Sequence, residues 1–430
     1  MATYRLYPST SGPSAPASYN GDFISGVVFG VAGGGNWLEG YWWWVCPDEG
    51  GSGFQPTGAT KCALWSVTSS GGGVLVPGSV VTSGALTAGQ WNYIPLSTPI
   101  QLAPSVDPTT PANGSAYVAA IGCNGPFPDT ADGWTDALTN GTLTGYANGA
   151  TPYGIAQGCF SDTGTDPSVT FPGQSSSEDT FWVDVQISTA PPPGYTGSYR
   201  LWPNKADANN ETSGDAELNY TIATEIDLTQ ACTLNNAWYY SASGFTELAT
   251  RCDVWNIETG LPVASITSPS WSAAAGSGWI SAAFAADTVL PAGNYRVSVY
   301  CANGTSGVWA AKDNSSNYYG QGGSGGVGAA GITWPCMTAP SQPDAASGYT
   351  YNASDSGSTP PYTNGVAISA QPPFGQTPGG TVIFPQLYAP VGAETNQTQN
   401  YWVDLEVTPV PASPMILGDE DTPWHVRIRS

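Results

Sequence analysis

Basic side chains are scarce in this chain of 430 residues. It has 9 lysines and arginines against 32 aspartates and glutamates, which gives a net charge of −23. Such a chain repels nucleic-acid phosphates and anionic lipid headgroups, so binding to either is disfavoured. Long apolar runs are also missing, because no segment approaches the roughly 20 residues that a membrane-spanning helix needs. We therefore expect no nucleic acid as a partner and no insertion into a membrane.

Histidine is nearly absent, and this limits the chemistry of the chain. The single histidine is His425, near the C-terminal end. A histidine-based catalytic triad and a three-histidine metal site are therefore excluded within one chain. Two carboxylates alone could serve a glycosidase, and Asp184 and Asp404 form the obvious pair, but they fall in separate halves of the chain. We predict no catalytic residue, and we expect no cofactor and no metal.

Glycine, proline and aromatic residues are, by contrast, abundant. The chain has 54 glycines and 37 prolines, and 12% of its residues are aromatic. Long runs of helix-forming residues do not occur. This combination is typical of many short strands joined by turns, so the sequence predicts an all-β protein.

The chain repeats itself. Residues 4–8 read Tyr-Arg-Leu-Tyr-Pro, and residues 199–203 read Tyr-Arg-Leu-Trp-Pro. Further matches in the same order join 61–65 with 251–255, Trp91 with Trp279, 117–123 with 295–301, and 181–187 with 401–407. The last match has the pattern aromatic-Trp-Val-Asp and precedes a proline-rich segment in both places. The sequence therefore predicts two copies of one module, each closed by this strand.

These landmarks set the predicted domains. We expect a first β-sandwich over residues 1–190, a Pro/Gly linker over 191–198, a second β-sandwich over 199–409 and a C-terminal extension over 410–430. Candidate strands of the first copy are residues 26–31, 38–45, 62–68, 89–96, 116–123, 153–158 and 181–187. Short strands at this spacing predict two tandem antiparallel β-sandwich domains of jelly-roll-like type, followed by a short C-terminal tail.

The eight cysteines divide evenly between the copies: Cys46, Cys62, Cys123, Cys159, Cys232, Cys252, Cys301 and Cys336. Each copy has two early and two late cysteines. This order suggests the disulfides Cys46–Cys62, Cys123–Cys159, Cys232–Cys252 and Cys301–Cys336, although sequence alone does not fix connectivity. Free buried thiols are the alternative. A metal site is disfavoured, because no Cys-x-x-Cys spacing and no supporting histidine occur.

Three tryptophans are candidate ligand-binding residues: Trp37, Trp42 and Trp44. On a strand, Trp42 and Trp44 share one face, and the aromatic residues beside them share the other. One face must be the core, so the other leaves its indoles to be covered or exposed. Exposed indoles stack on sugar rings or anchor protein interfaces. The second copy keeps aromatic residues at 238–240, which favours packing or subunit contact.

The C-terminal tail has a pattern of its own. Its apolar residues Trp424, Val426 and Ile428 alternate with His425, Arg427 and Arg429. A lone strand is not stable in water and needs a sheet edge to join. We therefore predict that the tail docks by strand addition onto a neighbouring subunit or another assembly protein. A disordered end is the alternative.

Several of these motifs resemble those of a known family. They are Leu64-Trp65 before a glycine-rich turn, the later Gly-Trp pair, Ala-Tyr-Val-Ala at 116–119, and the closing aromatic-Trp-Val-Asp strand. The chain resembles an actinobacterial extracellular β-sandwich family that is catalogued as a domain of unknown function. Copies of that family also occur in tail proteins of phages that infect actinobacteria, and residues 422–428 are similar to the tail ends of such proteins.

The resemblance implies a setting as well as a fold. We expect a non-enzymatic structural protein of a virion, as a minor tail protein with a role in host-surface attachment. Other virion proteins, further copies of the chain and an envelope polysaccharide are the expected partners. The rival expectation is a secreted or cell-surface carbohydrate-binding protein of an actinobacterium. Residues 1–8 have neither a basic nor an apolar signal region, so we expect either a removed signal or release by lysis.

Overall fold

The structure is a computed structural model. It describes residues 2–7, 12, 17–19, 22–46, 60–68, 70–104, 116–124, 127–130, 133–151, 154–175, 179–204, 220–241, 246–301, 312–313, 332–339, 368–370 and 400–411. All regular elements in these ranges are β-strands, and all strand pairs are antiparallel. The prediction of an all-β protein built from antiparallel sheets is confirmed.

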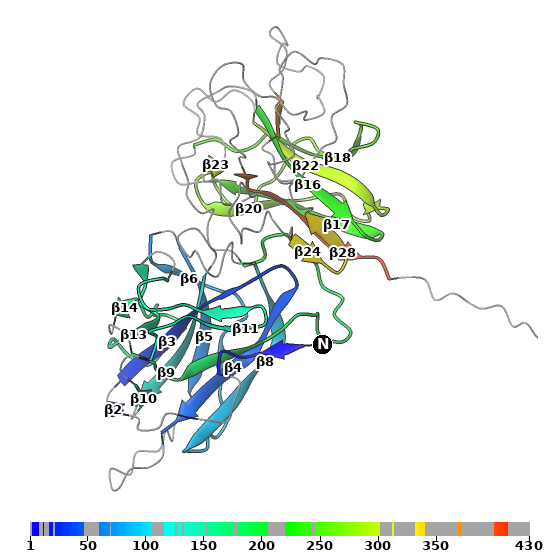
Figure 1. Cartoon of the computed structure of the whole chain (residues 1–430). Coiled ribbons are helices and arrows are strands. Elements are labelled where there is room, and N and C mark those ends of the chain that lie inside the picture. Colours follow the sequence, from blue (N-terminus) through cyan, green and yellow to red (C-terminus); the bar gives the residue numbers. More distant parts are fainter. Residues whose placement is uncertain are drawn as a thin grey trace, which may run out of the picture.

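The first half of the chain forms two main sheets (Figure 1). The smaller has the order β1 (Thr3–Tyr4), β15 (Val183–Ser188), β4 (Asn36–Val45) and β8 (Gln90–Leu102). The larger has the order β11 (Leu138–Asn140), β12 (Leu143–Gly145), β3 (Asp22–Val31), β9 (Tyr117–Asn124), β5 (Lys61–Val67) and β6 (Gly73–Leu75). Its side pairings add β7 (Val81–Thr82), β13 (Gly158–Ser161) and β14 (Gln174–Ser175), while β2 (Ala17–Tyr19) pairs with β10 (Phe127–Asp129).

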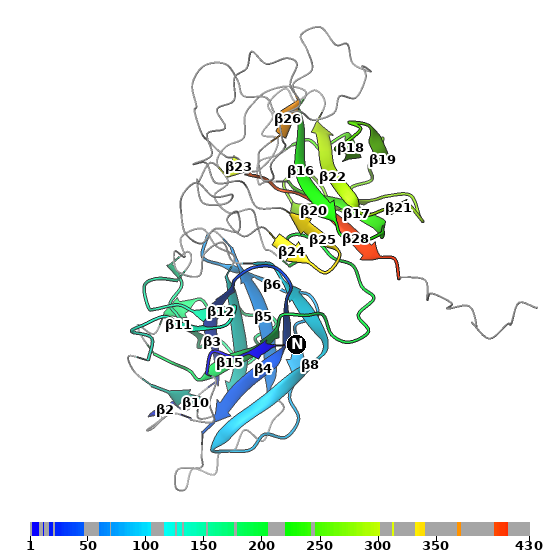
Figure 2. The ribbon, with the colours of Figure 1, turned by 45° about the vertical axis from the view of Figure 1, so that its right-hand side comes forward.

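The second half repeats this plan (Figure 2). In its smaller sheet β17 (Cys232–Ser241) pairs with β20 (Gly278–Ala283), β21 (Val289–Leu290) and β28 (Val403–Pro409). The larger sheet has the order β19 (Pro262–Ile266), β18 (Arg251–Asn256), β22 (Gly293–Cys301), β16 (Tyr220–Leu228), β25 (Met337–Ala339) and β24 (Ile332–Trp334). Outside that order, β26 (Ile368–Ala370) pairs with β16, and β23 (Lys312–Asp313) pairs with β27 (Asn400–Tyr401).

The strand registers agree between the halves residue by residue. Matching pairs are Trp42–Asp184 with Trp238–Asp404, Trp44–Trp91 with Tyr240–Trp279, and Leu64–Ala119 with Val254–Val297. The pairing of the closing strand also contains one register shift in each half. Residues that match in the sequence repeat therefore occupy matching positions in the sheets.

Each half buries its own core between its sheets. In the first half, Tyr41 and Trp43 of β4 pack with Val183 and Val185 of β15. In the second half, Tyr239 belongs to the equivalent cluster. Alternation along a strand places every second side chain on this inner face, so the other face of β4 must be covered by something else.

Two predicted strands differ from the observed ones. The strand predicted over 181–187 begins at Val183, because Trp182 has a φ of 48°, outside the extended region. The strand predicted over 153–158 is instead Gly158–Ser161, which pairs with β3. The other first-copy strands lie where the sequence predicts them, with ends shifted by a few residues.

The predicted disulfides are wrong for the part of the chain that is described. Seven cysteines are buried and form no disulfide in the part of the chain that the structure describes, while the side chain of Cys301 lies outside the described residues. The geometry explains why. Cys123 packs in the core between the sheets, whereas Cys159 packs on the opposite face of the larger sheet. Cys46 follows a strand of the smaller sheet, and Cys62 lies in the larger one.

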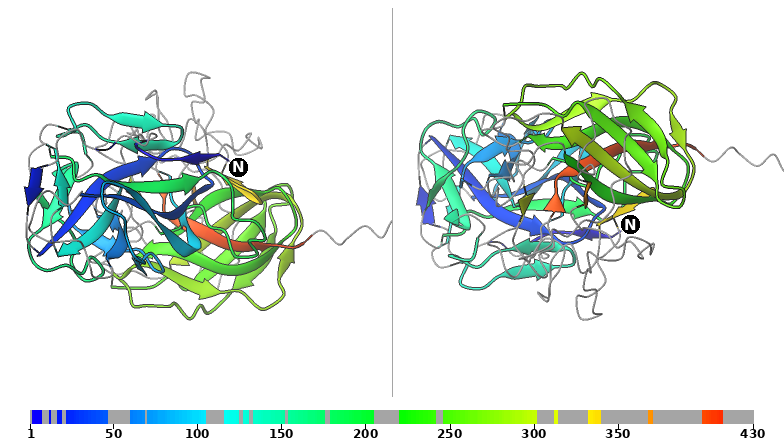
Figure 3. Two further views of the ribbon diagram at one scale, coloured as in Figure 1. Left: turned by 90° about the horizontal axis from the view of Figure 1, so that it is seen from below. Right: turned by 90° about the horizontal axis from the view of Figure 1, so that it is seen from above.

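Figure 3 looks along the line that joins the two halves, and shows the second half displaced to one side of the first. The β24–β25 hairpin lies at the side of the second half that faces the first half (Figures 1 and 2).

Candidate functional site at the closing strands

The closing strand of the first half presents a buried aspartate to the start of the chain. Oδ1 of Asp184 accepts hydrogen bonds from the backbone N–H groups of Leu6, at 2.8 Å, and Val185, at 2.7 Å. Oδ2 accepts from the backbone N–H of Tyr7, at 3.0 Å, and from Nε of Arg5, at 3.3 Å. Both carboxylate oxygens are therefore used to hold the N-terminal segment against β15.

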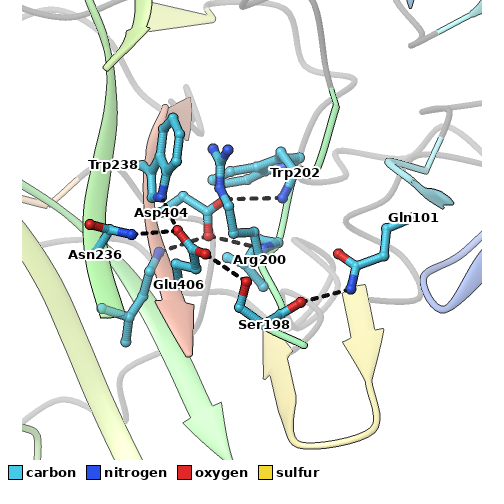
Figure 4. A network of polar contacts seen from close by, with 10 residues as sticks. Gln101, Ser198, Arg200, Trp202, Asn236, Trp238, Asp404 and Glu406 are labelled. Carbon is cyan, nitrogen blue, oxygen red and sulfur yellow. Dashed lines mark hydrogen bonds and ion pairs between the residues drawn. The ribbon is translucent and has the colours of Figure 1, made fainter. Parts of the chain in front are cut away.

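The second half contains the same arrangement (Figure 4). Oδ1 of Asp404 accepts from the backbone N–H groups of Leu201, at 2.9 Å, and Leu405, at 2.7 Å. Oδ2 accepts from the backbone N–H of Trp202, at 3.1 Å, and from Nε of Arg200, at 3.2 Å. We call this set of contacts the latch of each half: an arginine and the two residues after it, fastened to the aspartate of the closing strand.

Aromatic rings surround the arginine of the first latch. The guanidinium carbon of Arg5 lies 3.8 Å from the ring centroid of Trp42 and 4.9 Å from that of Trp91. Tyr7 stacks on Trp91 and on Trp182, with centroids 5.6 and 5.1 Å apart. Cation–π contacts in such a covered setting contribute on the order of 1–2 kcal/mol each.

The second latch keeps these contacts. The guanidinium carbon of Arg200 lies 3.7 Å from the ring of Trp238 and 5.1 Å from that of Trp279. Trp202 packs against Trp279 and Trp402, with centroids 6.1 and 5.1 Å apart. In both halves the outer face of the smaller sheet is thus covered by an arginine and a group of large rings.

The electrostatics of the latch follow from burial. Burial raises the pKa of Asp184 to about 6, against the opposing effect of the hydrogen bonds from Tyr7 and Leu6 and the charge of Arg5. Burial raises the pKa of Asp404 as well, against the charge of Arg200. Each carboxylate is fully occupied, and the two lie in different sheets of different halves. The arrangement closes each half of the chain on itself.

The second latch has an additional carboxylate that the first lacks. Glu406 accepts hydrogen bonds from the hydroxyl of Ser198, at 2.5 Å, Nδ2 of Asn236, at 2.8 Å, and Nε1 of Trp238, at 2.9 Å. Burial alone would raise the pKa of Glu406, but these hydrogen bonds outweigh it and lower that pKa. The backbone oxygen of Ser198 also accepts from Nε2 of Gln101, which connects this network to the first half (Figure 4).

Trp37 does not offer an exposed ring. It is 0% exposed and belongs to the core cluster of the second half, although it lies in β4 of the first. Its ring makes edge contacts with Tyr195, Tyr199 and Trp334, with centroids 4.6, 6.2 and 6.2 Å apart. Trp37 therefore joins the two halves, a role that its sequence position did not reveal because the alternation shows only which face it occupies.

Trp42 and Trp44 are half-buried. Arg5 covers Trp42, and Trp44 contacts Trp91 edge-on with centroids 6.0 Å apart. The exposed aromatic residue of this face is instead Tyr93, at 36% exposure, whose ring lies 4.9 Å from that of Trp42. The sequence signal for Tyr93 was its alternation with buried residues along β8.

A hollow of about 340 Å³ lies beside Tyr93. Residues 81–86 and residues 92–95 of β8 line it. The Tyr93 hydroxyl donates to the backbone oxygen of Glu39 at 3.2 Å, and burial raises the pKa of Tyr93 to about 12. Asn92 is held by three hydrogen bonds to the backbone of residues 87 and 90. The tyrosine thus has a fixed ring beside an open groove.

The remaining predictions concern the C-terminal tail, metal binding and membrane insertion. The predicted docking tail, with Trp424, Val426, Arg427, Ile428 and Arg429, lies outside the described residues. Within the described ranges no group of histidine, cysteine, aspartate or glutamate is arranged to hold a metal. No helix long and apolar enough to cross a membrane occurs in them.

Comparison with known proteins gave no match to any family model, curated protein or solved structure.

Proposed function

We propose that this protein is a non-enzymatic structural component of a virion, a minor tail protein of a phage that infects an actinobacterium. Its partners are other virion proteins and further copies of itself, and its location is the extracellular particle. One observation carries the proposal. The carboxylates that repeat between the halves, Asp184 and Asp404, are fully used in closing the sandwiches. The sequence resemblance to phage tail proteins gives the setting.

A role in host attachment adds a ligand to this proposal. The hollow beside Tyr93 has a volume of about 340 Å³, at the lower end of the range of small-molecule sites. Tyrosine rings stack on the apolar faces of sugars, and the hydrogen bond from the Tyr93 hydroxyl to the backbone of Glu39 holds this ring in place. The net charge of −23 disfavours an acidic polysaccharide, so a neutral one is the expected ligand. The exposed Tyr93 ring beside this hollow also favours the second candidate function, a secreted or cell-surface carbohydrate-binding protein.

Purified particles provide the test of the virion assignment. Mass spectrometry of phage particles should find this chain in a constant ratio to the major tail protein. Deleting residues 422–430 should abolish its incorporation while leaving the purified protein folded. Detection only in the culture fluid of uninfected cells would contradict the virion assignment and favour the second candidate.

Attachment is tested separately. Binding to immobilised dextran and galactan is compared for the unaltered chain, Tyr93→Ala and the control Val169→Ala, whose side chain is 75% exposed. Tyr93→Ala should lose at least tenfold in affinity, while Val169→Ala binds as before. Equal binding by all three proteins would show that the hollow beside Tyr93 is not the polysaccharide-binding site.

A further inference from the structure

Two cysteines of the second half meet beside the β24–β25 hairpin. Cys232 begins β17, and Cys336 lies in the turn between β24 and β25. Both are 0% exposed and belong to the same core cluster. In the sequence they are about 100 residues apart, so only the fold brings them together.

Hydrogen bonds hold both cysteines against one short connection, residues 229–231, between β16 and β17. The backbone N–H of Thr229 donates to the backbone oxygen of Cys336 at 3.0 Å. Sγ of Cys232 lies 3.5 Å from the backbone oxygen of Gln230 and donates to it. The strand pairing of Leu228 with Met337 fixes the hairpin at the same place. The side chain of Cys232 and the backbone of Cys336 are thus both held against this short segment, which keeps the two residues close together.

The two thiols also contact each other. A hydrogen bond with Cys336 lowers the pKa of Cys232, and the same bond, together with burial, raises the pKa of Cys336. Cys252 shares the core cluster, but its pKa is raised by burial and by Asp253, and no described cysteine contributes to that shift. The partner of Cys232 in the fold is therefore Cys336 and not Cys252.

We propose that Cys232 and Cys336 are a cross-linking site, which forms a disulfide when the protein meets a low-molecular-weight disulfide. The thiolate of one cysteine attacks a sulfur of that oxidant and releases one small thiol. The thiolate of the second cysteine then attacks the mixed disulfide, forms the protein S–S bond and releases the second small thiol. The two protein thiols are oxidised, the oxidant is reduced to two thiols, and the two protons pass to the leaving thiolates.

The position of the hairpin gives the cross-link its effect. Trp334 of β24 packs on Trp37 of the first half, and the backbone of Thr333 lies against Gly34. A covalent bond from Cys336 to β17 ties this hairpin to the core of the second half. Oxidation would therefore fix the surface that the first half contacts, and reduction would leave it held by the pairing with β16 and by packing.

Peptide mapping of the unaltered full chain tests the proposal. The purified protein is incubated with oxidised glutathione, denatured without reductant, alkylated, digested and analysed by mass spectrometry. The expected product is a peptide pair joined through Cys232 and Cys336, with the other cysteines alkylated. Alkylation of both cysteines, or a cross-link from either one to Cys252 or Cys301, would overturn the assignment.

Variants and stability add a second readout. Cys232→Ser should remove the joined peptides and leave Cys336 open to alkylation, while the matched control Cys252→Ser keeps the cross-link. The oxidised unaltered chain should unfold several degrees above its reduced form. That difference should vanish in Cys232→Ser. An unchanged midpoint on reduction of the unaltered chain would contradict the stabilising role.

Discussion

The aspartates of the latches show how one side chain can close a sandwich. Asp404 is 0% exposed. Its carboxylate accepts hydrogen bonds from the backbone N–H groups of Leu201 and Trp202, at the start of the second half, and of Leu405, its neighbour in the strand. It also faces the charge of Arg200. Removing the carboxylate would leave that guanidinium buried among rings without its hydrogen-bonded counter-charge, with Glu406 as the remaining carboxylate beside it. Such a loss costs more than the loss of a surface ion pair.

Asp404→Ala is therefore expected to lower the free energy of unfolding of the second half by about 3–5 kcal/mol. Urea unfolding followed by tryptophan fluorescence measures this. Glu258→Ala, which removes an exposed carboxylate of the same half, is the matched control and should change stability by less than about 0.5 kcal/mol. Equal effects of the two substitutions would show that the latch does not stabilise the fold.

The buried carboxylate of Glu225 should make the stability of the fold depend on pH. Burial raises the pKa of Glu225 to about 7, although Arg296 lies 3.4 Å away and opposes the shift, and Asp227 adds to it. The native state therefore holds more protons than the unfolded chain between about pH 4.5 and pH 7. Its stability falls as pH rises through this window, and Glu225 accounts for up to about 3 kcal/mol of the loss.

Unfolding midpoints at pH 5 and pH 8 check this expectation, with the lower midpoint at pH 8. Asp184, whose pKa burial raises to about 6, changes stability in the same direction. Glu225→Gln should flatten the dependence, because the amide does not titrate. A midpoint that is higher at pH 8 would contradict the sign of the argument.

At the scale of elements, the sequence predicted where most strands lie, but not which segments pack on their outer faces. The repeat landmarks placed Trp91 and Trp279, and Asp184 and Asp404, at matching positions of the sheets, because strand alternation and register follow from the pattern of apolar residues. The outer faces were not predictable in this way. Alternation shows that a side chain leaves the core, but not which distant segment covers it.

The latch and the cysteines illustrate this limit. Arg5 covers Trp42 from 37 positions away in the chain, by contacts that no local pattern encodes. The cysteine order suggested Cys232–Cys252, whereas the fold brings Cys336, in the β24–β25 hairpin, to Cys232. The predicted strand over 38–45 begins one residue after Trp37, which lies in β4, and the half whose core Trp37 enters depends on how the two halves pack.

The loop before β4 and the β24–β25 hairpin make a contact that a single methyl group should disturb. A Cβ on Gly34 would lie 2.4 Å from the backbone oxygen of Thr333 and 2.8 Å from its nitrogen. Backbone atoms cannot rotate away, so Gly34→Ala should force the two elements apart. We expect a loss of about 1–3 kcal/mol in the free energy of unfolding.

The control for this substitution is Gly84→Ala, where an added Cβ meets nothing within 4 Å. Hydrogen exchange of residues 332–339 gives the local readout. Exchange there should quicken in Gly34→Ala and stay unchanged in Gly84→Ala. Unchanged protection in both variants would mean that the hairpin does not depend on this contact.

At the scale of the whole molecule, Trp37 carries a side chain of the first half into the core of the second. Its ring is completely buried among Tyr195, Tyr199 and Trp334, and Gln101 adds hydrogen bonds to Tyr195 and to the backbone of Ser198. Most inter-domain contacts are smaller and more polar, and they allow the domains to move. A large ring from the first half that is buried in the core of the second couples the stabilities of the two halves.

Trp37→Ala should therefore cost about 3–5 kcal/mol and separate the unfolding of the two halves. Scanning calorimetry should show one transition for the unaltered chain and two for the variant. Trp271→Ala is the control, because that ring packs on Tyr239 inside the second half, 4.7 Å between centroids. Trp271→Ala should lower stability but still unfold in a single transition. Two transitions in the unaltered chain would show that the stabilities of the two halves are not coupled.

The latch also has a consequence for synthesis on the ribosome. Arg5 and Asp184 are separated by 179 residues in the chain, and Arg200 and Asp404 by 204. A nascent chain must therefore keep its opening segment undocked until almost the whole of that half has been translated. Because such distant partners meet slowly, unfinished sheets stay open to proteases and to other chains during that interval, and chaperone assistance would act there first.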